Sequence, residues 1–170
     1  PGFYAQQGMR GLIHALGVIC WFYAMTRITM AEVTAMNYMV PVYVTLGAAL
    51  FLGERFAARR LLAILAAFVG ALIVLRPGLR VLESGHGAMI ATALCFAASY
   101  LMAKRMSGQM HASVVVGWLS ITVTICLAPI ALAVWVTPTW TQLGWLFLVA
   151  GFATAGHYSM TLAFSAAPVS

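Results

Sequence analysis

The stretch MNYMVPVYVTLGAALFLGE, residues 36–54, is apolar enough to lie in lipid, yet it holds a proline flanked by polar side chains. Asn37 and Tyr38 precede Pro41, and Tyr43 follows it. Proline has no backbone N–H, so Pro41 leaves the carbonyl of Asn37 without its helical donor. An unpaired carbonyl is costly in hydrocarbon unless it faces protein, water or a ligand. The stretch therefore predicts a kinked helix that lines a cavity, with a kink satisfied by a neighbouring helix as the alternative.

Composition extends this prediction to the whole chain. Of the 170 residues, 64% are hydrophobic and 7% are charged, and the mean hydropathy is +0.99. Soluble domains carry about 25% charged residues. The composition predicts an all-α, polytopic membrane protein whose first partner is the lipid bilayer. The basic residues behind the net charge of +6 lie between apolar runs and do not alternate with aromatic residues, which argues against a nucleic-acid partner.

Charged and turn-forming residues divide the chain into six apolar runs, each a candidate membrane crossing. A crossing needs about 20 apolar residues, so the first and third runs are short. The arginines that flank these two runs can extend them by placing their charged ends at the membrane surface. The runs are residues 11–26, 31–53, 61–75, 87–103, 112–136 and 143–167.

The loops between the runs alternate sides, and their basic residues predict the orientation. One side collects six basic residues and the other collects three. The richer side is expected to be cytoplasmic, which places the loops at residues 54–60 and 104–111 inside the cell and the protein in the cell (inner) membrane. The richer side holds Arg10, Arg55, Arg59, Arg60, Lys104 and Arg105, and the other side holds Arg27, Arg76 and Arg80.

A weak internal repeat indicates how the runs are organised. FYAMTRITMAEVT, residues 22–34, matches HYSMTLAFSAAPV, residues 157–169, at Tyr, Met, Thr and Ala positions. The copies lie five crossings apart, so they run in opposite directions, as in inverted-repeat transporters. The predicted division is residues 1–78 in the first repeat, 79–86 as a linker and 87–170 in the second. The chain would be the middle six of about ten helices, truncated at both ends, with a second proline helix starting near Pro168.

A family resemblance rests on residues 22–78. Its motifs are Pro41, Leu52–Gly53–Glu54, Arg59–Arg60 and Gly70. Together with LFLGERFAARRLLAILAAFVGALIVLRPG, residues 50–78, this pattern resembles the EamA-type permeases of the drug/metabolite transporter superfamily. The resemblance implies a helical bundle of about ten helices in two inverted five-helix repeats. It also implies transport of small organic metabolites or drugs by alternating access through a central cavity.

Candidate solute-binding residues gather around the proline and in the other runs. The residues that bracket the weak point of the second run are Asn37, Tyr38, Pro41 and Tyr43. His14 and His157 lie inside the first and sixth runs, where an ionisable side chain predicts a functional site such as a proton relay. A neutral histidine bonded to a backbone carbonyl is the alternative. The aromatic side chains that can stack on a flat or cationic solute include Tyr100, Trp118 and Tyr158.

The acidic residues lie at the ends of the runs. The resemblance implies a structural or gating role at the inner face for Glu54, with Arg59 and Arg60. Glu32, at the other end of the second run, is expected to stabilise the start of its helix. Small residues four positions apart also predict close helix packing. These pairs are Ala66 with Gly70 and Gly151 with Ala155.

The three cysteines lie inside apolar runs without metal-binding spacing, so neither a metal site nor a cofactor is expected. Two alternatives to a permease are a non-transporting membrane scaffold and a histidine-dependent intramembrane enzyme. The enzyme is disfavoured because no nucleophile or acid pattern accompanies the histidines. A homodimer is left open. The histidines that an enzyme would use are His14, His86, His111 and His157.

Overall fold

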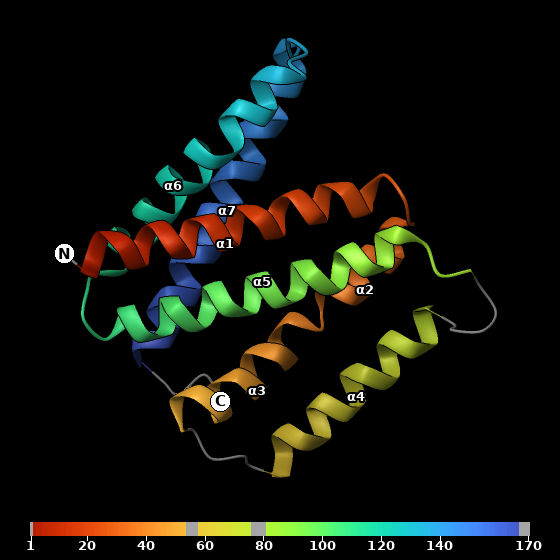
Figure 1. The fold of residues 1–170 in the computed structure, drawn as a ribbon, viewed down its shortest axis with the longest axis vertical. Helices are drawn as coiled ribbons and strands as arrows, with labels where there is room; N and C mark the ends of the chain where they lie inside the picture. The colour runs from red at the N-terminus through yellow and green to blue at the C-terminus, as the bar shows by residue number, and fades with distance from the viewer. Residues whose placement is uncertain (1, 54–57, 76–80, 167–170) are drawn as a thin grey trace. The chain divides into compact units, whose positions relative to one another are not determined.

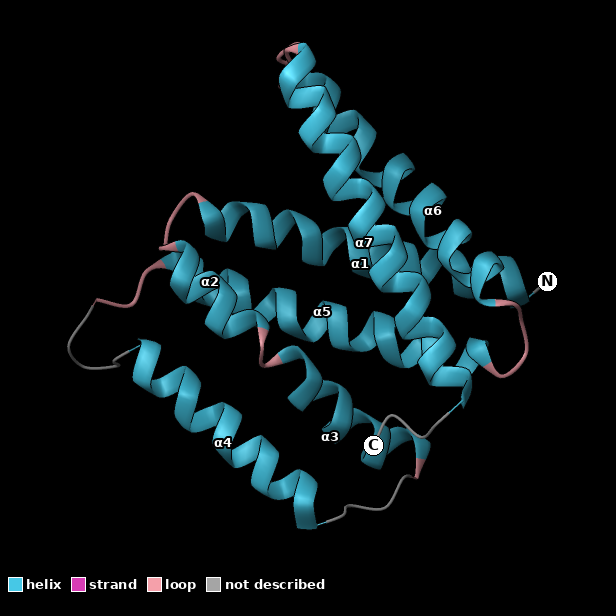
Figure 2. Ribbon diagram, turned by 180° about the vertical axis from the view of Figure 1, so that it is seen from behind, coloured by secondary structure: helices cyan, strands magenta, loops and turns pink. Residues whose placement is uncertain are grey.

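Helix is the only regular element in residues 2–53, 58–75 and 81–166, the part of the chain that this computed structural model describes (Figure 1). Figure 2 shows the same helices from behind. The predicted all-α class is therefore confirmed. The helices are α1 (Gly2–Met25), α2 (Met30–Asn37), α3 (Val40–Leu52), α4 (Ala58–Leu75), α5 (Ser84–Ser107), α6 (Ala112–Ala133) and α7 (Trp140–Ala166).

Five helical segments within the described residues are long and apolar enough to cross a membrane, as expected for a polytopic membrane protein. α2 and α3 together form one of these segments, Met30–Leu52. α4 has 18 residues, and its apolar stretch, Leu61–Val74, is shorter than the other segments. The third predicted crossing, residues 61–75, therefore depends on α4, whose length of about 27 Å approaches the roughly 30 Å of the hydrocarbon layer.

The first span is longer than the sequence predicts. α1 begins at Gly2 and has 24 residues, so the run expected at residues 11–26 covers only part of it. Arg10, expected at the membrane surface, lies inside the helix and is 0% exposed. That expectation was wrong because the guanidinium finds a backbone acceptor within the protein. The loop cations still favour the same cytoplasmic side when Arg10 is left out.

The second span is broken close to Pro41. α2 ends at Asn37 and α3 begins at Val40, with two turn residues between them. Pro41 lies in the first turn of α3, where a missing N–H costs little because an N–H there would have no acceptor within α3. Pro129, in contrast, lies inside a continuous α6. The structure thus replaces the predicted kink at Pro41 with a full break.

The chain folds into two compact units. The α2–α5 unit runs from Ile13 to Met102, and the α6–α7 unit combines the residues up to Leu12 with those from Ala103 onward. These units reflect contacts in space. They do not test the boundaries proposed for the sequence repeats at residues 78 and 87, which stay a prediction.

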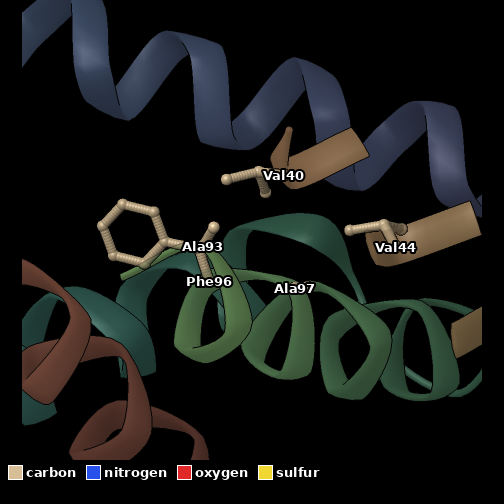
Figure 3. Close-up of a cluster of buried hydrophobic side chains, with 5 residues drawn as sticks. All are labelled: Val40, Val44, Ala93, Phe96 and Ala97. Atoms are coloured by element: carbon tan, nitrogen blue, oxygen red, sulfur yellow. The ribbon is translucent and has the colours of Figure 1, made fainter. Parts of the chain in front are cut away.

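The core of the α2–α5 unit lies between α3 and α5 (Figure 3). Its buried residues are Val40 and Val44 from α3 and Ala93, Phe96 and Ala97 from α5. α1 approaches the same core at Gly17, where an added Cβ would come within 2.8 Å of the Phe96 ring. The Thr92 hydroxyl donates to the Gly17 carbonyl at 3.1 Å. A small residue thus allows two helices to approach closely and bond through a side chain.

Two helices begin with reciprocal caps between the residue before the helix and its third residue. In α2, Thr29 and Glu32 form a capping box, which confirms a stabilising role for Glu32 at the helix start. In α7, Gln142 takes the place of the glutamate. The Thr139 N–H donates to Gln142 Oε1 at 2.8 Å, and the Gln142 N–H donates to the Thr139 hydroxyl at 3.3 Å.

α5 begins with a histidine in the corresponding position. The Glu83 N–H donates to His86 Nδ1 at 3.1 Å, and the His86 N–H donates to the Glu83 carbonyl at 3.0 Å. α5 starts at Ser84. The last three residues of the predicted linker, 79–86, are consequently helical, because the side chain of His86 caps the helix there.

Small residues do not pack where their spacing predicts. A Cβ added at Gly70 or Gly151 would meet no atom within 4 Å, so neither glycine marks a close contact in the described structure. Both line grooves between helices. The spacing rule fails here because it cannot show which helix face has a neighbour. Close approach occurs instead at Gly11, Gly17, Gly47 and Gly85.

Candidate functional site

The break between α2 and α3 places an amide in apolar surroundings. Among the described residues, Asn37 Oδ1 is buried without a hydrogen-bond partner. The backbone carbonyl of Asn37 also loses its helical donor, because Pro41 has no N–H. Buried polar oxygens of this kind require a donor from water or a ligand. The break can therefore supply acceptors to a polar solute.

Tyr38 and Pro41, beside Asn37, are both exposed. The Tyr38 side chain lines a groove of about 750 Å³ between α2 and α4. Most of the groove is apolar, so the phenol is one of its few polar groups. The small lining residues include Ala31, Ala35, Ala67, Gly70 and Ala71.

An aromatic cluster forms where α1 meets α5 in the α2–α5 unit. His14 is buried and stacks on Phe96, with ring centroids 4.6 Å apart and an interplanar angle of 21°. The Tyr100 ring lies 6.1 Å from His14, and the Trp21 ring lies 6.4 Å from Phe96. Among the described residues, Trp21 Nε1 is buried without a hydrogen-bond partner. The cluster combines flat stacking surfaces with a free donor.

Three predicted residues come together at this cluster. Tyr43 and Tyr100 both pack against the α3–α5 core that contains Phe96, the residue on which His14 stacks. Tyr38 instead lines the groove toward α4. The four residues predicted around Pro41 thus do not form one surface, because Tyr38 and Tyr43 face different helices.

Two buried polar residues of α1 were missed by the sequence predictions. Arg10 Nη1 donates to the Val115 carbonyl of α6 at 2.8 Å. Gln7, one turn earlier, is 1% exposed, and neither of its amide atoms has a hydrogen-bond partner among the described residues. His157 of α7 lies within electrostatic reach of Arg10. In the α6–α7 unit, α1, α6 and α7 therefore all lie near the buried guanidinium of Arg10, and the unsatisfied amide of Gln7 is one helical turn away on α1.

The sequence does contain a signal for this polar face. Gln7, Arg10 and His14 follow one another at positions i, i+3 and i+7, which places them on one side of a helix. All three are buried. Ending the apolar run at its first charged residue starts the predicted helix after Arg10, and this excludes the polar face.

The other predicted residues of the α6–α7 unit lie on α6 and α7. Trp118 packs edge-on against Phe3 and Tyr4, with ring centroids 6.2 and 5.5 Å apart respectively. Tyr158 lines a groove of about 710 Å³ between the two helices. His157 is half-buried, and its backbone carbonyl accepts from the Thr161 hydroxyl at 2.7 Å.

The proposed inner-face group is described only in part. Glu54 and the side chain of Arg60 lie outside the described residues, and Arg59 is exposed near the start of α4. Gly53 ends α3 in the left-handed conformation, with φ of 69°, and its N–H donates to the Ala48 carbonyl. This helix end explains the glycine of the Leu-Gly-Glu motif, because other residues adopt that conformation at a cost. The gating role stays a prediction.

The chain is similar in sequence to proteins named as transporters. The model of the EamA-like transporter family matches residues 4–76, which confirms the resemblance inferred from residues 22–78. A riboflavin transporter of Rhizobium johnstonii is 34% identical over 160 residues, which cover 93% of this chain and 53% of the relative. No solved structure matches the chain significantly.

The names of two further relatives specify different solutes. A pseudopaline exporter of Pseudomonas aeruginosa is 29% identical over 92% of this chain and 56% of its own length. An S-adenosylmethionine uptake transporter of Rickettsia prowazekii is 22% identical over 92% of this chain and 53% of its own length. The chain thus spans about half the length of these relatives, and they include both exporters and uptake systems.

Proposed function

We propose that this chain forms part of a permease for small organic solutes, since its residues 4–76 belong to the EamA-like transporter family. The observation that carries the proposal is the broken second span. A break inside an otherwise apolar membrane segment leaves Asn37 with a buried oxygen that no described residue satisfies. Discontinuous helices that present backbone and side-chain groups in this way form the midplane sites of secondary transporters.

The aromatic cluster favours a flat heteroaromatic solute. Rings such as those of His14, Phe96 and Tyr100 stack well on a planar ligand, and the indole N–H of Trp21 supplies a donor at its edge. Riboflavin, named in a relative that covers 93% of this chain, belongs to that chemical class. It is therefore the first solute to test.

The mechanism we propose is alternating access, with the two inverted repeats rocking about the solute. The repeat boundaries, the cytoplasmic loops at 54–60 and 104–111, location in the inner membrane and a homodimer remain predictions of the sequence. An enzymatic role is disfavoured because the three relatives described above are all named as transporters.

Solute flux through the full-length protein tests this proposal. The protein is reconstituted into liposomes, and uptake of radiolabelled riboflavin and S-adenosylmethionine is compared with protein-free liposomes. We expect saturable uptake of at least one of the two solutes, and an at least tenfold loss in Asn37→Leu, about 1.4 kcal/mol of transition-state stabilisation. Thr124→Val, on an exposed face of α6, is the matched polar-to-apolar control and keeps the wild-type rate.

The outcomes separate the alternatives. A protein that folds but moves neither solute is a scaffold under these conditions, and the permease assignment then fails for this solute class. Chemical conversion of a solute without its movement across the bilayer identifies an enzyme. Flux that is unchanged in Asn37→Leu retains the permease but removes the broken span from its solute path.

A further inference from the structure

The starts of α2 and α5 meet through a buried acid and a buried histidine. Glu32 Oε2 accepts from the Thr29 N–H at 2.9 Å and from the Thr29 hydroxyl at 2.7 Å. The other oxygen, Glu32 Oε1, lies 3.8 Å from His86 Nε2. Glu32 is 5% exposed and His86 is 8% exposed. A carboxylate whose first oxygen is occupied by a helix cap therefore turns its second oxygen toward the imidazole of another helix.

The backbone of Glu83 offers His86 Nδ1 a different partner in each protonation state. In the neutral ring, Nδ1 accepts the Glu83 N–H at 3.1 Å, which leaves the proton on Nε2, facing Glu32. In the imidazolium, Nδ1 carries a proton and can donate to the Glu83 carbonyl, 3.3 Å away. That carbonyl already accepts the His86 N–H at 3.0 Å, and its second lone pair is available for this bond. Neither state strands a polar atom of the ring.

The surrounding charges act in opposite directions. The positive end of the α5 dipole disfavours an imidazolium at its first turn. The Glu32 carboxylate favours one, since opposite charges within about 4 to 6 Å stabilise each other's charged form. Arg27 and Glu83 line the same region, and Arg27 lies over the Tyr23 ring at 5.3 Å. Arg76 and Arg80 lie outside the described residues.

Water has a route to this pair. Glu32, Glu83, His86 and Arg27 line a cavity of about 570 Å³ at the end of the α2–α5 unit. The hydroxyls of Tyr23 and Ser84 lie 3.0 Å apart, and their hydrogen bond joins α1 to the start of α5. The histidine is thus buried at the edge of a cavity, where proton exchange with water does not require the unit to unfold.

We propose that His86, paired with Glu32, is a proton-binding site of this protein. Proton binding exchanges the Glu83 N–H bond that caps α5 for an ion pair that joins α5 to α2. Histidine is the side chain whose charge ordinarily changes between pH 5 and 8. α7 provides the contrast, because Gln142 makes the same cap with a side chain that does not titrate. The site stands independently of the permease assignment.

Titration of His86 in the full-length protein tests the site without any solute. The protein is labelled with ¹⁵N-histidine and followed by NMR from pH 5 to pH 8, and the His86 signals are identified by their loss in His86→Gln. We expect the ring to titrate in this range and the neutral form to carry its proton on Nε2. In Glu32→Gln the midpoint is expected to move to lower pH by at least about half a unit, since the imidazolium loses its carboxylate partner.

Two results overturn the proposal. One is a His86 ring that does not titrate in this range, and the other is a midpoint that Glu32→Gln leaves in place. His86→Gln retains the cap, as in α7, and separates capping from proton binding. It should fold like the wild type, with a melting temperature less dependent on pH between 5 and 8. A wild-type pH dependence that persists in His86→Gln also contradicts the site, whatever the flux assay shows.

Discussion

Arg10 on α1 donates from Nη1 to the backbone carbonyl of Val115 on α6 across 2.8 Å, with none of its surface exposed. A guanidinium carries five N–H donors and a full charge, so its removal from water has a large desolvation cost. The chain has only three acidic residues to balance nine basic ones. We therefore expect the buried charge of Arg10 to contribute to transport and not to the free energy of unfolding.

Replacing Arg10 with methionine separates these two roles. Methionine keeps most of the side-chain length and removes the buried charge, so the melting temperature of the full-length protein is expected to stay the same or rise. Solute flux in liposomes is expected to fall at least tenfold, which corresponds to about 1.4 kcal/mol. Arg10→Lys keeps the charge and serves as the control, with a smaller loss of flux. A large drop in melting temperature for Arg10→Met would show instead that Arg10 holds the fold together.

The break at Pro41 yields a second prediction. Pro41→Ala restores an N–H that can bond the Asn37 carbonyl, so α2 and α3 can join into one continuous helix. The variant is expected to be at least as stable as the wild type and to transport solute several-fold more slowly. Pro129→Ala is the matched control, because α6 is already continuous through Pro129. Solute flux through the Pro129→Ala protein should therefore equal that of the wild type. Equal flux in the two variants would mean that the break has no part in transport.

Gly17 and Gly70 are expected to respond oppositely to alanine. A Cβ at Gly17 would come within 2.8 Å of the Phe96 ring, so Gly17→Ala should lower the free energy of unfolding by about 1–3 kcal/mol. A Cβ at Gly70 meets nothing within 4 Å, and alanine favours a helix interior by about 0.5–1 kcal/mol. Unfolding in mixed detergent micelles measures both. Comparable losses in the two variants would contradict the packing of α1 on α5.

Orientation follows from the loop charges and can be measured in intact cells. The three native cysteines are replaced, and single cysteines are introduced at Arg59 and at Gln142, both exposed. The excess of basic residues predicts that a membrane-impermeant thiol reagent labels the Gln142→Cys protein in intact cells. The Arg59→Cys protein should react only after the cells are opened. The reverse pattern would place the loop at residues 54–60 outside.

Local chemistry explains why the sequence predicted the helices and a kink near Pro41. A proline inside an apolar run removes a donor wherever the chain folds, so the interruption near Pro41 could be inferred without any neighbour. Glu32 could likewise be assigned to a helix start. The length of α1 could not, because the Val115 carbonyl of α6, which accepts from Arg10 inside the helix, is distant in the sequence.

Pairings between distant residues account for most of what the sequence did not predict. His86 lies in a stretch rich in glycine and charge, which is typical of a loop, and its cap with Glu83 and contact with Glu32 appear only once the helices are placed. The same limit applies to Tyr38 and Tyr43. These residues are five positions apart, and Tyr38 lines the groove toward α4 while Tyr43 packs against the core that α3 forms with α5.

Water access at Asn37 tests most directly whether the broken span lines a solute path. A single cysteine replaces Asn37 in the cysteine-free full-length protein, and Leu65→Cys, an exposed apolar position of α4, is the control. Only a thiolate in contact with water reacts rapidly with a charged thiosulfonate reagent. We predict that Asn37→Cys reacts, that a transported solute slows the reaction, and that Leu65→Cys does not react. An unreactive Asn37→Cys in a folded protein would contradict the account.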